Sequence, residues 1–215
     1  MKYFTISEML KSDTALKMRI WNGATKEHED NMRALIENVL DPLRERYGHP
    51  IYVSSGYRCP KLNKAVNGAI NSQHMRGEAA DIYAKGIGDG GSQSAMTTPS
   101  GSASQGVGPS TLRPGSGTSG SGTLTTTTAP QSVIAGKDPQ SPAPMNYVSE
   151  NLKLARLIAE AGNFDQMILE EVGPNDLNPK WIHVSYKRNG WNRKSIIKKV
   201  VGKAGYVTVK AEELF

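Results

Sequence analysis

The sequence predicts an α+β domain, with a small, largely antiparallel sheet, helices packed on it, and a long flexible insertion that interrupts it. Apolar residues recur at helical spacing over 29–43 and 149–161. Four short runs of β-branched, aromatic or alternating apolar residues are typical of strands, at 51–54, 79–83, 166–169 and 181–186. Between the second and third of these runs, residues 87–146 show neither pattern.

The N-terminal part is predicted to be mostly helical. Residues 4–20 mix apolar with polar positions, and Ser7 and Ser12 are candidate N-caps for one or two short helices. In the longer helix that follows, Pro42 removes a backbone hydrogen-bond donor. The helix therefore either kinks there or restarts, with Asp41 as its cap and Pro42 in the first turn.

One or two helical turns over 60–66 are expected between the first two strands. The second half of the chain begins with a helix capped by Ser149. A turn-rich stretch, 170–176, separates the third strand from the fourth, which we expect to lie antiparallel to it. A short basic helix over 193–200 then precedes a final strand at 206–209.

The segment 87–146 is rich in Gly, Ser, Thr and Pro and contains no aromatic residue. Such a composition cannot bury enough apolar surface to offset the entropy lost on ordering. We therefore predict a flexible insertion within one domain that is formed by residues 1–86 and 147–215. A core can tolerate this insertion, because the free-energy cost of closing a loop grows only logarithmically with its length.

Charge is unevenly distributed in this chain of net charge +6. Between Leu177 and Lys210 there are nine Lys or Arg residues and no acidic residue. This run is either a solvated basic face or a surface that attracts a polyanion, such as the bacterial envelope. It matches no nucleic-acid-binding motif, which argues against a nucleic-acid partner. Cys59 is the single cysteine, which excludes an intramolecular disulfide.

Three residues are the candidate metal ligands: His74, Asp81 and His183. We expect His74 in a loop that turns at Gly77, and Asp81 and His183 on strands whose alternation can aim both at one site. Two imidazoles and a carboxylate form a three-ligand zinc site with a fourth position for water. Each stretch taken alone is also compatible with a surface residue or a buried core histidine.

The motif S-x-H-x-x-G-x-A-x-D over 72–81, followed by W-x-H over 181–183, resembles the D-Ala-D-Ala carboxypeptidase-type zinc peptidases, which share the hedgehog/DD-peptidase fold. Other stretches resemble the small, often phage-encoded branch of that family. They are Phe4-Thr5-Ile6-Ser7-Glu8, Leu40-Asp41-Pro42-Leu43-Arg44, Val53-Ser54-Ser55-Gly56-Tyr57-Arg58 and Phe164-Asp165-Gln166-Met167-Ile168. The resemblance covers residues 3–86 and 147–200.

This resemblance implies a peptidase with one zinc ion that hydrolyses peptidoglycan stem peptides by a zinc-activated water. A D-Ala-D-Ala carboxypeptidase and an endolysin-type endopeptidase both fit. Many relatives carry the catalytic acid three residues before the last histidine, where this chain has Lys180. In the branch that the chain resembles most, an acid follows the third strand, which implies Glu170 as the general base, with Glu171 as the alternative.

The resemblance also places Arg58 in the substrate cleft, where a guanidinium can stabilise an oxyanion or bind a substrate carboxylate. The alternative for Arg58 is a structural ion pair. Ser72, Gln73 and Tyr57 are expected to bind substrate.

Because Lys180 stands where many relatives carry the catalytic acid, a second class of function is also possible. This is a non-catalytic cell-wall-binding or virion structural module that retains a zinc site. The N-terminus lacks the apolar run of a signal peptide, and no stretch is long enough to span a bilayer. We therefore expect synthesis in the cytoplasm and action on the cell wall if the protein is phage-encoded or released.

Overall fold

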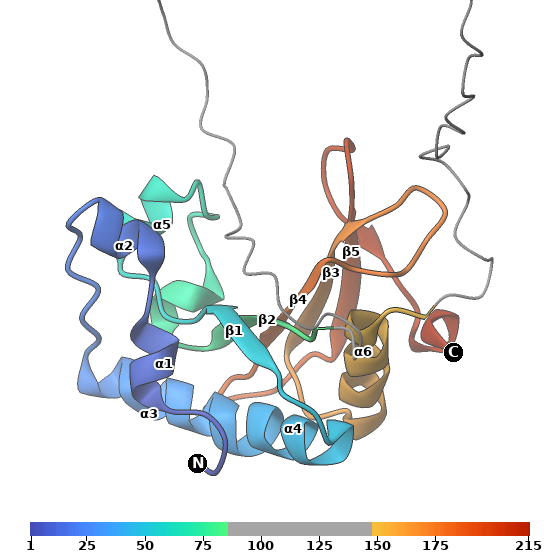
Figure 1. Cartoon of the computed structure of the whole chain (residues 1–215), viewed down its shortest axis with the longest axis horizontal. Coiled ribbons are helices and arrows are strands. Elements are labelled where there is room, and N and C mark those ends of the chain that lie inside the picture. The colour runs from blue at the N-terminus through green and yellow to red at the C-terminus, as the bar shows by residue number, and fades with distance from the viewer. Residues whose placement is uncertain (86–147) are drawn as a thin grey trace, which may run out of the picture. The chain divides into compact units, whose positions relative to one another are not determined.

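One mixed sheet runs through the residues that the computed structural model describes, 1–85 and 148–215 (Figure 1). The predicted insertion, 87–146, lies outside these residues. The sheet has the order β1-β2-β4-β3-β5-β6. Its strands are β1 (Tyr52–Ser55), β2 (Ala79–Tyr83), β3 (Gln166–Val172), β4 (Trp181–Ser185), β5 (Ser195–Val200) and β6 (Val207–Thr208). All neighbours are antiparallel except β3 and β5, so the α+β prediction of a largely antiparallel sheet is confirmed.

Helices precede, interrupt and follow these strands. They are α1 (Ile6–Leu10), α2 (Asp13–Lys17), α3 (Lys26–Leu35), the π-helical η1 (Ile36–Leu40), α4 (Asp41–Tyr47), α5 (Pro60–Ala65), the 3₁₀ turn η2 (Gln73–Arg76), α6 (Glu150–Ala161) and the 3₁₀ turn η3 (Ala211–Leu214). Ser12 caps α2 as expected, whereas α1 is capped by Thr5 and not by Ser7. None of the helices in the described residues is long and apolar enough to cross a membrane.

Pro42 accounts for the π-helical turn between α3 and α4. A proline ring clashes with the carbonyl four residues earlier and offers no N–H of its own. The chain widens over η1, where the Asp41 N–H bonds to the Ile36 carbonyl, and α4 then begins with Pro42 in its first turn. The Asp41 carboxylate does not cap α4. It accepts hydrogen bonds from the backbone N–H groups of Tyr3 (2.9 Å) and Phe4 (3.3 Å).

The two faces of the sheet have different roles. One face carries Ile82, Val184 and Leu169, which are fully buried in a core shared with the helices. The α3–η1–α4 segment contributes Leu35 and Leu40 to this core, and Figure 1 shows α3 and α4 running beneath the sheet. Because neighbouring strand residues point to opposite faces, the alternate positions of β2, β4 and β3 face away from this core.

One sequence prediction in the second half is wrong, and a second is wrong in part. The basic stretch over 193–200 forms strand β5 and not a helix, because Ile196 and Val200 enter the core while the chain pairs in parallel with β3. The turn-rich stretch expected over 170–176 begins later than predicted, since β3 continues through Glu170 to Val172 and the turn lies at Pro174 and Asn175. In a short run of apolar and basic residues, the pairing partner decides the conformation and local propensity does not.

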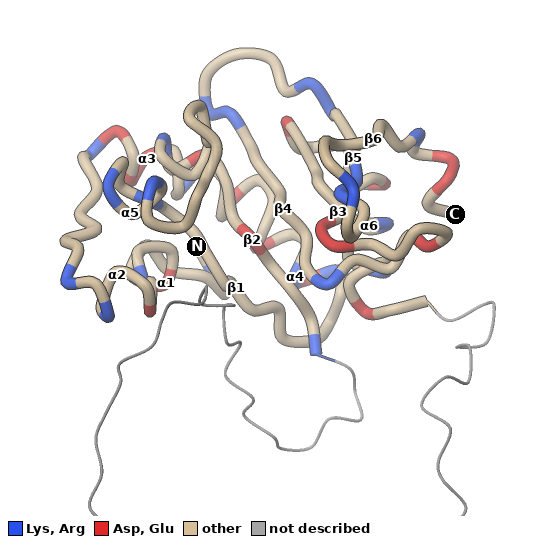
Figure 2. The backbone as a smooth tube through the Cα atoms, turned by 90° about the horizontal axis from the view of Figure 1, so that it is seen from above, with Lys and Arg blue, Asp and Glu red and all other residues tan. Residues whose placement is uncertain are grey.

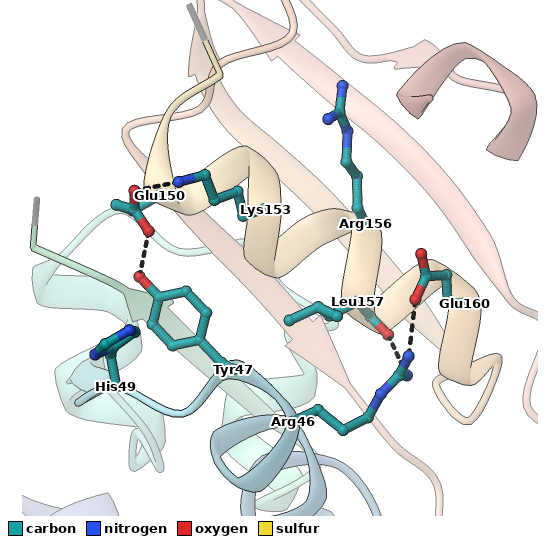
Figure 3. Close-up of a pocket in the computed structure, with 8 residues that line it drawn as sticks. All are labelled: Arg46, Tyr47, His49, Glu150, Lys153, Arg156, Leu157 and Glu160. Atoms are coloured by element: carbon teal, nitrogen blue, oxygen red, sulfur yellow. Dashed lines mark hydrogen bonds and ion pairs between the residues drawn. The ribbon is translucent and has the colours of Figure 1, made fainter.

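Helix α6 is held against α4 by polar contacts. Arg46 bonds to the Glu160 carboxylate (2.7 Å) and the Leu157 carbonyl (3.2 Å), and the Tyr47 hydroxyl donates to Glu150 (2.6 Å), as Figure 3 shows. These contacts surround a cavity of about 410 Å³, lined by Arg46, Tyr47, His49, Glu150, Lys153, Arg156, Leu157 and Glu160. Both glutamates are paired with neighbouring side chains, so the cavity is the seam of a helix–helix contact and includes no residue of the predicted site.

The fully buried carboxylate of Asp165 also joins the two described parts of the chain. It accepts hydrogen bonds from Gln73 of η2 (3.0 Å) and, through both oxygens, from Arg193, and it pairs with Lys187 (3.1 Å). Burial by itself raises the pKa of Asp165, but the hydrogen bonds from Arg193 outweigh it and hold the pKa well below its usual range.

Replacing Asp165 with Asn is expected to lower the free energy of unfolding by about 3 kcal/mol, because two cations lose their buried partner. Urea denaturation of both proteins at pH 7 measures this difference. A carboxyl with a lowered folded-state pKa stabilises the protein above its unfolded pKa of about 4, and this contribution is lost as the pH falls further. The difference between wild type and D165N should therefore shrink below pH ~4, and a constant difference down to pH ~2 would contradict the ionic origin.

Candidate metal centre

Three side-chain atoms from distant parts of the chain meet in one small triangle. His74 Nε2 lies 3.1 Å from His183 Nδ1 and 3.2 Å from Asp81 Oδ1, and His183 Nδ1 lies 3.0 Å from Asp81 Oδ1. All three residues are at least nine-tenths buried. Ligand atoms about 2.0–2.1 Å from a tetrahedral zinc ion lie about 3.4 Å apart, so the triangle is close to one face of such a site.

Strand pairing places two of the three ligand candidates. Asp81 on β2 is the direct register partner of His183 on β4, so their side chains leave the sheet on the same face. This is the face opposite the hydrophobic core. Since the two residues are 102 positions apart, only the antiparallel β2–β4 pair brings them together.

His74 comes from η2 and is oriented by the backbone. Its Nδ1–H donates to the carbonyl of Gly56 (2.6 Å), which leaves the lone pair of Nε2 directed at the other two ligand atoms. Gly77 ends η2 at φ +71°, a left-handed conformation that favours glycine. A side chain here would also collide with the His28 carbonyl, 2.5 Å from the Cβ position, so the turn between His74 and Asp81 requires glycine.

The protonation states suit metal binding. Burial lowers the pKa of His74 and outweighs the opposing effect of Asp81, so the imidazole is neutral at pH 7. Burial alone raises the pKa of Asp81, but the two histidines outweigh it and hold the carboxyl ionised. Neutral imidazole and ionised carboxylate are the forms that ligate metals. The residues therefore fit a zinc ion, since each of the three offers one N or O ligand atom to the same buried group.

Arg58 lies against this group. Its Nη2 donates to Asp81 Oδ2 (2.5 Å) and lies 3.3 Å from His74 Nε2, while its Nε donates to Ser55 Oγ (2.7 Å). The guanidinium thus holds the carboxylate oxygen that the triangle does not use, and it adds a positive charge at the edge of the site. Arg58 therefore forms an ion pair with Asp81, as the alternative of a structural ion pair expected, and this ion pair borders the candidate metal centre.

The adjacent residues Glu170 and Glu171 point in different directions. Glu170 is the register partner of Trp181 and lies two positions from Ile168, the register partner of His183, so it shares the face of the ligands. Burial and the neighbouring Asp81 raise the pKa of Glu170. At Glu171 the chain has φ +52° and the β3–β5 register shifts, which indicates a β-bulge. Glu171 pairs with Lys180 at 2.5 Å, away from the ligands.

The three expected substrate-binding residues differ in how far they are exposed to solvent. Tyr57 is buried against His28, with ring centroids 4.9 Å apart, and Gln73 is buried with its amide on Asp165. Ser72, half-buried, precedes η2 and is the only one of the three with substantial exposure. Their role in substrate binding stays a prediction.

Sequence reasoning missed two supporting groups: the carbonyl of Gly56 and the carboxylate of Asp165. A backbone carbonyl carries no signal in a sequence. Asp165 lies in a stretch that contributed to the family resemblance, but its partners Gln73 and Arg193 become neighbours only in the folded chain.

Replacing His183 with Ala is expected to abolish stoichiometric zinc binding, because two ligands cannot hold the ion as tightly as three. Metal analysis of dialysed protein measures the zinc content. The matched control is His49→Ala, which removes an exposed histidine that lines the α4–α6 cavity. H49A should keep the wild-type zinc content, and full zinc content in H183A would refute the ligand assignment.

Comparison with known proteins identifies a protein family that is similar to the N-terminal half of the chain. The family model of Peptidase M15 matches residues 2–108, which include His74, Asp81 and Arg58 but end before His183 and Glu170. No curated protein matches the chain. The part of the site that lies beyond the match is joined to the matched part by the β2–β4 pairing. The family match and the His74–Asp81–His183 group together support a zinc peptidase of the M15 family.

Proposed function

We propose that this protein is a zinc-dependent peptidase that hydrolyses peptidoglycan stem peptides. The observation that carries the proposal is the buried triangle of His74, Asp81 and His183, with Glu170 on the same face of the sheet. A structural zinc site is closed by a fourth protein ligand, whereas this group offers three ligand atoms among the described residues. Three ligands and a neighbouring carboxylate are the arrangement of a hydrolytic site.

His74, Asp81 and His183 would hold the zinc ion, which would polarise the scissile carbonyl as a Lewis acid and lower the pKa of a bound water. Glu170 acts as the general base that accepts the proton of the attacking water and returns it to the leaving amine. The raised pKa of Glu170 suits this double role, because a group that must both accept and donate a proton works best near the ambient pH. Arg58 stabilises negative charge that develops on the carbonyl oxygen.

The proposed substrate class follows from the M15 family, and two bonds within it remain candidates. One is the terminal D-Ala-D-Ala bond of the stem peptide, and the other is an internal bond of the stem, as in endolysin-type endopeptidases. The loop between β4 and β5, visible in Figure 2, carries Lys187, Arg188, Arg193 and Lys194, of which the first three pair with only two acids, Asp165 and Asp30. The positive charge left over is consistent with attraction to the anionic cell envelope. The proposed partner is therefore the anionic bacterial envelope, and the proposed place of action is the cell wall of a phage host.

Replacing Glu170 with Gln is expected to preserve zinc content and lower kcat at least about 100-fold, because the general base is lost while the ligands are intact. Metal analysis and peptide turnover measured on the same preparation separate the two effects. Glu171→Gln is the matched control, since Glu171 contacts Lys180 and not the ligands. Loss of turnover in E171Q with normal turnover in E170Q would transfer the base to Glu171.

Mass spectrometry of purified muropeptides incubated with zinc-loaded protein identifies the bond that is cut, with H183A as the blank. Loss of one terminal D-alanine is the result expected of a carboxypeptidase. Release of the stem peptide at an internal bond is the result expected of an endopeptidase. Intact muropeptides at all enzyme concentrations would contradict the proposal and support the non-catalytic cell-wall-binding or virion structural module.

A further inference from the structure

Beyond Glu170, a row of polar side chains continues across the ligand-bearing face of the sheet. In the β3–β5 pair, Lys199 falls opposite the bulge at Glu170 and Glu171. In the β5–β6 pair, Lys198 is the partner of Val207, so Tyr206 follows in register beside Lys199. Alternation puts Lys199 and Tyr206 on the same face as Glu170.

Tyr206 is held in this position by Lys199. The Lys199 ammonium lies 5.2 Å from the centre of the Tyr206 ring and donates a hydrogen bond to the Gly205 carbonyl (3.2 Å). Gly205 has φ +77°, a conformation that favours glycine and turns the chain immediately before Tyr206. These contacts fix the backbone and the ring, while 56% of the residue stays exposed and available to a ligand.

The electrostatic surroundings of Tyr206 agree with its position in the strand register. Partial burial, Glu170 and Asp81 each raise the pKa of the Tyr206 hydroxyl, so the phenol lies within electrostatic reach of the site and stays protonated at neutral pH. A protonated phenol is a hydrogen-bond donor. The described residues thus place an exposed aromatic ring with a donor group on the face of the proposed base, two strands from it and on the side away from β1 and Arg58.

We propose that Tyr206 is a substrate-contacting residue: its ring borders the peptide site and its hydroxyl donates a hydrogen bond to an oxygen of the bound peptide. This inference rests on the proposed function and adds a residue that determines substrate affinity. Arg58 follows β1 and Tyr206 precedes β6, and these are the two edge strands of the sheet. The peptide would therefore be contacted from both edges, with His74, Asp81 and His183 between them. Lys199 acts through Tyr206 as a positioning residue.

The test measures binding apart from turnover. Zinc-loaded E170Q protein and its E170Q/Y206F double variant are titrated by calorimetry with the synthetic pentapeptide L-Ala-D-Glu-L-Lys-D-Ala-D-Ala. Loss of one hydrogen bond to the ligand is expected to weaken binding about five- to tenfold. E170Q/Y206A should bind more weakly still, because it also loses the ring. Zinc content should be the same in all three proteins.

In the turnover assay, Y206F should raise KM five- to tenfold and change kcat less than twofold, since a contact made equally in the ground and transition states affects KM alone. The control is Tyr3→Phe, because Tyr3 is also an exposed tyrosine with a lysine ammonium near its ring (5.1 Å) but belongs to the N-terminal segment. Y3F should leave KM unchanged.

The outcomes separate the two proposals. Equal pentapeptide affinity for E170Q and E170Q/Y206F, with peptide binding intact, overturns the Tyr206 contact alone. A rise in KM that Y3F matches also overturns it, because the effect would then not be local. If E170Q binds no pentapeptide and wild type cleaves no muropeptide, the proposed function itself fails.

Discussion

The antiparallel pairing of β2 with β4 is the constraint on which the rest of the structure depends. It joins the two described parts of the chain and makes Asp81 the direct neighbour of His183. A shift of one residue in this register would move either side chain to the opposite, core-facing side of the sheet. The register is protected because Ile82 and Val184, which alternate with the ligands, are fully buried. The hydrophobic core thus determines the geometry of the polar site.

The polar site carries an electrostatic cost that neighbouring groups offset. Two imidazole rings and a carboxylate that are each at least nine-tenths buried lose contact with water, which costs free energy unless they are paired. Arg58 offsets part of this cost by donating a hydrogen bond to Asp81. The Gly56 carbonyl accepts the Nδ1–H of His74, which fixes the tautomer whose Nε2 is unprotonated. The burial that makes the arrangement costly also keeps His74 neutral, so the site is prepared for a metal at neutral pH.

A β-bulge and a buried carboxylate refine this framework. The bulge at Glu171 lets two consecutive glutamates diverge, one toward the ligands and one toward Lys180. Asp165 ties the turn that carries His74 to the segment between β4 and β5, through Gln73, Lys187 and Arg193. The Asp165 contacts join the two described parts of the chain, which helps a site assembled from two distant segments to keep one geometry.

The sequence by itself determined the elements whose signals are local. Glycine at 77, the alternation over 79–83 and the Ser149 cap predicted the turn, strand β2 and helix α6, and the motif residues His74, Asp81 and His183 predicted the ligand group. It predicted a helix where β5 lies, because a short apolar and basic run has no distinct period and its conformation depends on pairing with β3. Only the tertiary structure separated Glu170 from Glu171 and placed Tyr206 on the same face of the sheet as Glu170. Those relationships depend on strand register and a bulge, which are set by contacts between residues far apart in the chain.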